Sequence, residues 1–218
     1  MKPVNQERAK ANALCVMLAL AVGLTVGCGS ARVSKHYELT VPGNITPAAD
    51  ANPLPITILV GRLAAPALYR DDAIVYSTNG NSMGTYEYQR WLEPPTDMIA
   101  EVILRQLRGS GHYRGVYALR SDVKGDYLLH GHLYDFNEVT GPPLAGRVTM
   151  ELELRDMRTG TTVWTHFYTH DEPSTGKDVG AVVAALDKNL QQGIAESRAS
   201  LDQYFAEHPP TQPAPATR

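Results

Sequence analysis

A run of 14 mostly apolar residues near the start of the chain, residues 13–26, follows a short basic segment and ends at Gly27-Cys28. That order is typical of a secretory signal peptide, whereas a membrane-spanning helix needs about 20 apolar residues. We therefore expect residues 1–27 to be removed, which leaves 191 of the 218 residues, enough for one domain. The only other cysteine, Cys15, leaves with the signal, so core packing rather than a disulfide must stabilise this domain.

Residues 24–28 read Leu-Thr-Val-Gly-Cys and resemble the lipobox of bacterial lipoproteins, with Thr25 where that motif prefers leucine. The resemblance implies that Cys28 becomes the N-terminus and carries a thioether-linked diacylglycerol and an acylated amine, with chains such as palmitate. Several acyl chains make a stable anchor where a single chain is marginal. Because Gly29 rather than aspartate follows the cysteine, the resemblance favours anchoring at the periplasmic face of the outer membrane.

Charge and motifs argue against two classes of function. The removed segment holds three basic residues and one acidic residue, so the net charge falls from −3 for the whole chain to −5 for the remainder. An acidic domain of this kind is unsuited to binding nucleic acid. The sequence also lacks the G-x-x-x-x-G-K-[S/T] loop that holds nucleotide phosphates, so this chain cannot itself be an ATPase.

Composition predicts three parts after the signal. Residues 28–55 would form a lipidated N-terminus with a short strand over Lys35–Val41 and a Pro/Ala/Asn-rich linker, and the segment from Gly29 to Pro55 would give the anchored domain its reach. Residues 56–207 would form the folded domain, with a start near residue 35 as the alternative. Residues 208–218 contain four prolines and no apolar pattern, so we expect a disordered tail.

Hydrophobic periodicity predicts the elements of the domain. A β-branched run indicates a buried strand at residues 56–63, and a hairpin is expected at residues 74–91. A helix should begin at Pro94-Pro95 and end at the glycines 109 and 111. The remaining predicted elements are strands at residues 115–119, 126–139, 147–157 and 161–170, followed by a long helix at residues 177–205. Within that last helix, Gly193 is expected to cause a bend or a weak point.

The strand at residues 147–157 has the clearest register. Val148, Met150, Leu152 and Leu154 alternate with polar residues, which predicts a sheet with one solvent-facing side. Together with the order of the other elements, this predicts an α/β fold in which a mixed β-sheet carries two helices packed on one face.

Ser82 is the centre of a G-x-S-x-G match over residues 80–84, so a serine hydrolase is an alternative. The nucleophile elbow that this motif describes needs a strand before the serine and a helix after it. Here the sequence TYEYQRW follows and predicts a strand, and Gly, Asn and Ser are expected in a hairpin loop for turn geometry alone. The turn interpretation is therefore preferred, and no catalytic residue is assigned.

Histidines and carboxylates suggest no stronger site. His130 and His132 lie two apart on one predicted strand and His166 lies on a later one, so a zinc site could be drawn from them. No cysteine or acidic ligand has the matching spacing, which favours solvent-facing or cross-strand packing histidines. Glu151 and Glu153 share the polar side of one strand, the ordinary place for solvated charge. We expect neither a metal nor another cofactor.

Aromatic residues and arginines are concentrated between Tyr69 and Pro95. Tyr, Trp and Arg are the residues most enriched at interface hot spots, although alternate tyrosines on a strand can equally line a core. The candidate partner-binding residues are Arg70, Tyr76, Tyr86, Tyr88, Arg90 and Trp91.

Four segments carry a resemblance to a known family. They read APALYRDDAIVYSTN at residues 65–79, YEYQRWLEPPTDMI at residues 86–99, DYLLHGHLYDF at residues 126–136 and MELELRDMRTGTTVW at residues 150–164. In these segments the chain resembles the ABC-type transport auxiliary lipoproteins, also called PqiC-type lipoproteins, over roughly residues 35 to 205. That family is similar in fold to the N-terminal domain of TolB, which agrees with the sheet and two helices predicted above.

The resemblance implies a non-enzymatic auxiliary subunit. Such lipoproteins accompany mammalian-cell-entry (MCE) domain proteins in the transport of phospholipid or other hydrophobic molecules between membranes. The implied partner is therefore an MCE-domain protein of an ABC-type transporter, with a homo-oligomeric ring as a further expectation. Two alternatives stay open: a periplasmic lipid-carrying lipoprotein without a fixed MCE partner, which would need an enclosed apolar cavity, and a Ser82-dependent hydrolase.

Overall fold

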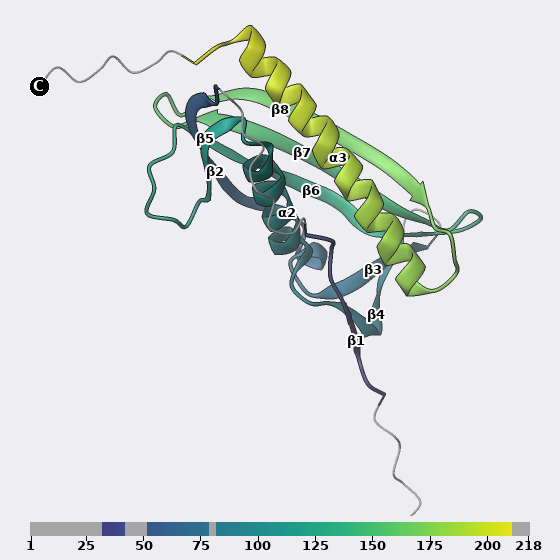
Figure 1. Cartoon of the computed structure of the whole chain (residues 1–218). Coiled ribbons are helices and arrows are strands. Elements are labelled where there is room, and N and C mark those ends of the chain that lie inside the picture. The colour runs from purple at the N-terminus through teal and green to yellow at the C-terminus, as the bar shows by residue number, and fades with distance from the viewer. Residues whose placement is uncertain (1–31, 42–51, 79–81, 211–218) are drawn as a thin grey trace, which may run out of the picture. The chain divides into compact units, whose positions relative to one another are not determined.

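The computed structural model describes residues 32–41, 52–78 and 82–210 (Figure 1). The predicted signal peptide, Cys28, part of the predicted linker and most of the tail lie outside the described residues. The strands are β1 (Lys35–Tyr37), β2 (Leu54–Ala64), β3 (Ala73–Thr78), β4 (Ser82–Trp91), β5 (Tyr113–Ala118), β6 (Tyr127–Thr140), β7 (Ala145–Asp156) and β8 (Thr162–Pro173). The helices are a 3-10 turn η1 (Ala67–Tyr69), α2 (Pro95–Ser110) and α3 (Val179–Glu207).

Strand β6 organises an eight-stranded mixed sheet. One edge of β6 pairs along its length with β7, which pairs in turn with β8, and both contacts are antiparallel. The other edge is shared, because the first half of β6 pairs in parallel with β2 and the second half pairs in parallel with β3. Beyond them, β5 joins β2, β4 joins β3, and β1 joins β4.

Both long helices cover the same face of this sheet (Figure 1). Helix α2 packs on β2 and β5, and helix α3 packs on β7 and β8. The core lies between these layers and includes side chains with no exposed surface, among them Ile58, Ile99, Val148, Leu186 and Leu190. The predicted fold class, a mixed sheet with two helices on one face, is confirmed.

Helix α2 begins and ends where its sequence predicts. Pro95 occupies the first turn, where the missing N–H has no helical partner to lose, and Gly111 ends the helix with φ of 67°. Asp178 precedes α3, and its carboxylate accepts a hydrogen bond from the Ala181 N–H at 3.0 Å. No helix in the described residues is both long and apolar enough to cross a membrane.

Gly193 does not interrupt α3, contrary to the expected bend or weak point. A Cβ at this position would lie 2.6 Å from the Tyr168 ring on β8, so the glycine lets the helix approach the sheet closely. Glycine lowers the stability of a helix interior. Here the close packing of α3 on β8, rather than a kink, explains the presence of the glycine.

The N-terminal segment belongs to the sheet rather than to a free tether. Lys35 and His36 of β1 pair in parallel with Gln89 and Arg90 of β4. Just beyond the strand, Leu39 is 2% exposed in the main core. The expectation that the whole stretch from Gly29 to Pro55 gives the domain reach is therefore wrong, because residues 35–39 are paired and packed.

Candidate functional site

Trp91 is not part of a docking surface, which corrects the expectation from sequence. Its side chain is 1% exposed and lies 5.3 Å from the Phe136 ring, between ring centroids. The strand pairing explains this burial, because Trp91 ends β4 on the side of the sheet that α2 and α3 cover. The alternative weighed for the aromatic segment, that part of it lines the core, is the correct one for this residue.

Tyr76 and Tyr86 form a half-buried cluster with Glu138. Their ring centroids are 5.1 Å apart, and the Tyr86 hydroxyl donates a hydrogen bond of 2.8 Å to the Glu138 carboxylate. Gly84 makes room for the Tyr76 ring, since a Cβ there would lie 2.5 Å from it. Burial, and then the bond to Glu138, raise the pKa of Tyr86, so this phenol stays protonated as a donor. The cluster ties β3, β4 and β6 together.

Arg90 forms an ion pair with Asp72, and Arg70 lies nearby in the sequence. Arg90 Nη1 donates to Asp72 Oδ1 at 2.6 Å, and both side chains are 36% exposed. Arg70 is exposed directly after η1, two residues before Asp72. Tyr88 is half-buried on β4, and its hydrogen bond to Glu87 raises its pKa.

Leu92 adds an apolar group that sequence reasoning missed. Its side chain is 59% exposed, directly after buried Trp91, and its backbone N–H donates to the Tyr37 carbonyl at 2.7 Å. Leu92 lies in a bend directly after the end of β4, two residues beyond Arg90. We call the set Arg70, Asp72, Tyr88, Arg90 and Leu92 the β4-end surface.

Ser82 lacks the surroundings of a nucleophile elbow. Residues 80 and 81 of its motif lie outside the described residues, while Ser82 itself begins strand β4, which continues to Trp91. A strand therefore follows the serine where the elbow requires a helix.

The three histidines do not share a site. His130 lies opposite Glu153 of β7, and His166 lies opposite Leu152 of the same strand. Because Leu152 and Glu153 are consecutive, they point to opposite faces of the sheet, and so do His166 and His130. Accordingly His166 stacks on Trp164, at a ring separation of 6.0 Å, while His132 stacks on Tyr134. Across the described part of the chain, no group of three or more metal-ligating side chains comes together.

Comparison with solved structures shows that this fold occurs in other proteins. The Xanthomonas campestris protein XCC0632, a DUF330 protein of known crystal structure, is 21% identical, with a TM-score of 0.69 over 80% of this chain and 98% of that one. A crystal structure of an uncharacterized protein is 14% identical, with a TM-score of 0.62 over 78% and 99% of the two chains. Both likenesses show the fold alone.

None of the curated proteins matches the sequence significantly. The model of the family described as "ABC-type transport auxiliary lipoprotein component" matches residues 37–196, from the end of β1 to the middle of α3. That match covers β2 to β8, helix α2, the first part of α3 and the β4-end surface. Because it spans more than half of the chain, this protein belongs to the family of ABC-type transport auxiliary lipoprotein components.

Proposed function

We propose that this protein is a non-enzymatic auxiliary subunit, anchored through Cys28 to the periplasmic face of the outer membrane, that docks an MCE-domain protein of an ABC-type transporter. The system would move phospholipid or another hydrophobic molecule between membranes. Family membership supports the auxiliary role, and the lipobox-like sequence before Gly29 supports the anchor.

The observation that carries this proposal is the pairing of β1 with the end of β4. His36 lies opposite Arg90, so the β4-end surface is one strand away from the segment that leads to Cys28. From Cys28 to Lys35 the chain can span about 25 Å at most, even fully extended. A lipidated Cys28 would therefore hold this part of the domain close to the membrane, and a partner reaching the membrane would meet it there.

The chemistry of the β4-end surface suits a protein partner. It joins one exposed leucine to two arginines, with Asp72 fixing the geometry of one guanidinium group. Arginines and a half-exposed tyrosine supply contact area with directed hydrogen bonds at the rim of an apolar contact. We expect the partner to present an apolar side chain framed by acceptors such as carboxylates.

Co-purification from membranes tests the proposal. Tagged wild-type protein is compared with Arg90→Ala and Leu92→Ala, which alter the surface, and with Arg158→Ala, whose 86% exposed side chain lies in the β7–β8 turn. We expect an MCE-domain protein to co-purify with wild type and with Arg158→Ala, and to be reduced at least five-fold with the other two. Equal recovery with all four proteins would refute the docking surface, and no MCE-domain protein in any sample would refute the partner.

A lipidation measurement tests the anchor separately. Intact mass of the protein extracted from outer-membrane fractions should correspond to a chain that begins at Cys28 and carries acyl groups. Cys28→Ala should abolish that mass and move the protein out of the outer-membrane fraction. An unchanged mass would rule out Cys28 as the attachment site.

A further inference from the structure

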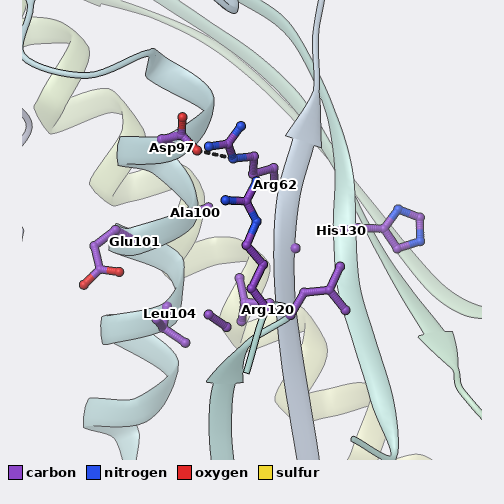
Figure 2. Close-up of a pocket in the computed structure, with 11 residues that line it drawn as sticks. Arg62, Asp97, Ala100, Glu101, Leu104, Arg120 and His130 are labelled. Carbon is purple, nitrogen blue, oxygen red and sulfur yellow. Dashed lines mark ion pairs between the residues drawn. The ribbon is translucent and has the colours of Figure 1, made fainter. Parts of the chain in front are cut away.

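A groove lies between α2 and the C-terminal part of β2, at the end of the molecule where β5 stops (Figure 2). Its volume is about 430 Å³, within the range of about 300–1,000 Å³ that small-molecule sites occupy. Strand β5 ends at Ala118, whereas β2 continues to Ala64, so the last residues of β2 stand beside α2 without β5 next to them. This groove is distinct from the β4-end surface and shares no residue with it.

One part of the groove is positively charged. Arg62 and Arg120 both line it, and Figure 2 shows their guanidinium groups in the same space between α2 and β2. Arg62 forms an ion pair with Asp97. Within the described residues Arg120 forms no ion pair, so two cationic groups face a single carboxylate here.

The second carboxylate of the groove does not offset this charge. Glu101 accepts a hydrogen bond of 2.5 Å from Arg105 one turn along α2. Figure 2 shows its carboxylate pointing away from Arg62 and Arg120. The arginine end therefore keeps a net positive charge, and guanidinium groups bind phosphate or carboxylate by paired hydrogen bonds.

The adjoining wall is apolar. Ala100 and Leu104 line the groove from α2, and Val60 and Leu119 line it from the sheet side. Leu119 is 44% exposed but lies near Gly61 and His130, on the side of β2 away from α2, so Ala100 and Leu104 supply the apolar surface next to the arginines. Two arginines beside aliphatic side chains match a molecule with an anionic head and an apolar tail.

We propose that this groove binds the anionic head group and the first methylene groups of an amphiphile, with Arg62 and Arg120 on the phosphate or carboxylate and with Ala100 and Leu104 against the tail. The volume suits part of a lipid, not a whole one. The site agrees in ligand class with the proposed transport role but needs no partner protein, so it is tested without one.

Calorimetric titration of the full chain, purified in a non-ionic detergent, tests the site. The probes are dihexanoyl phosphatidic acid below its micelle concentration, uncharged dihexanoylglycerol and inorganic phosphate. The variants are Arg62→Gln/Arg120→Gln for the anion contacts, Ala100→Phe for the apolar wall, and Arg158→Gln as a matched charge control outside the groove. Circular dichroism melts verify that each variant is folded.

We expect dihexanoyl phosphatidic acid to bind wild type and Arg158→Gln within two-fold of each other, and the double arginine variant at least ten-fold more weakly. Ala100→Phe should weaken the phosphatidic acid but not inorganic phosphate, and the uncharged lipid should bind at least ten-fold more weakly than the charged one. Phosphate binding as tightly as the amphiphile would show a plain anion site and overturn the amphiphile assignment. Unchanged binding by the double arginine variant, or no binding by wild type, would overturn the site itself.

Discussion

At the scale of single residues, identity alone did not distinguish core from surface in the aromatic segment. Trp91 and Arg90 are neighbours, yet one is 1% exposed and the other forms a partly exposed ion pair with Asp72. The half-buried pair Tyr76 and Tyr86 lies between these extremes, held by Glu138. Arg90 and its exposed neighbours are therefore the residues that can contact a partner. Replacing Trp91 would instead disturb the fold.

Truncating Trp91 should destabilise the protein strongly. We expect Trp91→Ala to lower the free energy of unfolding by about 3–5 kcal/mol, because it leaves a cavity beside Phe136, whereas Arg90→Ala should cost about 1 kcal/mol or less. Urea denaturation followed by circular dichroism measures both values. A cost below 1 kcal/mol for Trp91→Ala would contradict the burial described here.

Buried phenols should make the protein sensitive to alkaline pH. Burial, and then the nearby Asp135 charge, raise the pKa of Tyr69 to about 12, and its hydroxyl donates to Asn137 Oδ1 at 3.1 Å. A folded-state pKa above the unfolded value of about 10 contributes stability that is complete below pH 10 and is lost as the pH rises towards 12. The free energy of unfolding should therefore fall between pH 9 and pH 11.5.

Tyr69→Phe isolates this contribution. The variant has no proton to lose at this position, so its decrease in stability between pH 9 and pH 11.5 should be smaller than that of wild type by about 1–2 kcal/mol. Urea titrations at the two pH values provide the comparison. An equal decrease in both proteins would mean that Tyr69 ionises normally in the folded state.

At the scale of elements, α3 is fixed to the sheet by a polar contact inside an apolar interface. Asn189 has no exposed surface, and its side-chain amide donates to the carbonyls of Gly146 and His170 at 2.9 and 2.8 Å. Its carbonyl oxygen accepts from the Tyr168 hydroxyl at 2.6 Å. All these partners come from β7 and β8, so Asn189 sets the position of the helix along both strands. The Tyr168 ring is held in turn against Gly193.

Gly193→Ala should destabilise the protein although alanine favours helices. The added Cβ would lie 2.6 Å from a Tyr168 ring that cannot turn away without breaking its bonds to Asn189, so we expect a loss of about 1–3 kcal/mol. Gln192→Ala, one position earlier and exposed, is the control and should change stability by less than about 0.5 kcal/mol. Thermal melts of the two variants give the comparison, and a stabilised Gly193→Ala would show that α3 is not in close contact with β8.

At the scale of the whole molecule, the N-terminal segment completes the domain that begins at Ser34. Leu39 enters the main core after β1 has paired with β4, and the Thr40 N–H donates to Asp187 on α3 at 3.1 Å. The segment that leads towards the proposed anchor is thus bound to both the sheet and a helix. A force that a partner applies near the membrane would therefore act directly on the folded domain.

Leu39→Ala tests this arrangement. Removing a side chain that is 2% exposed should cost about 2–4 kcal/mol of folding free energy, whereas Val41→Ala, at a side chain 36% exposed, should cost less than about 1 kcal/mol. Guanidinium denaturation of both full-length variants provides the measurement. Similar small effects for the two residues would mean that residues 35–41 are a tether after all.

Local pattern by itself determined the elements, because hydrophobic periodicity and helix-ending residues act within a few positions. The alternation of Val148, Met150, Leu152 and Leu154 identified β7 and its buried face, and Gly111 marked the end of α2. The family resemblance likewise rested on contiguous segments and is confirmed by the match over residues 37–196.

Only the tertiary structure decided which residues far apart in the chain meet. The pairing of β1 with β4, the contact of Asn189 with β7 and β8, and the groove that brings Arg62 and Arg120 together all join residues tens of positions apart. Sequence pattern carries no information on such distances, because each residue's surroundings depend on strand order and helix placement. For that reason the burial of Trp91 and the exposure of Leu92 became evident only in the assembled fold.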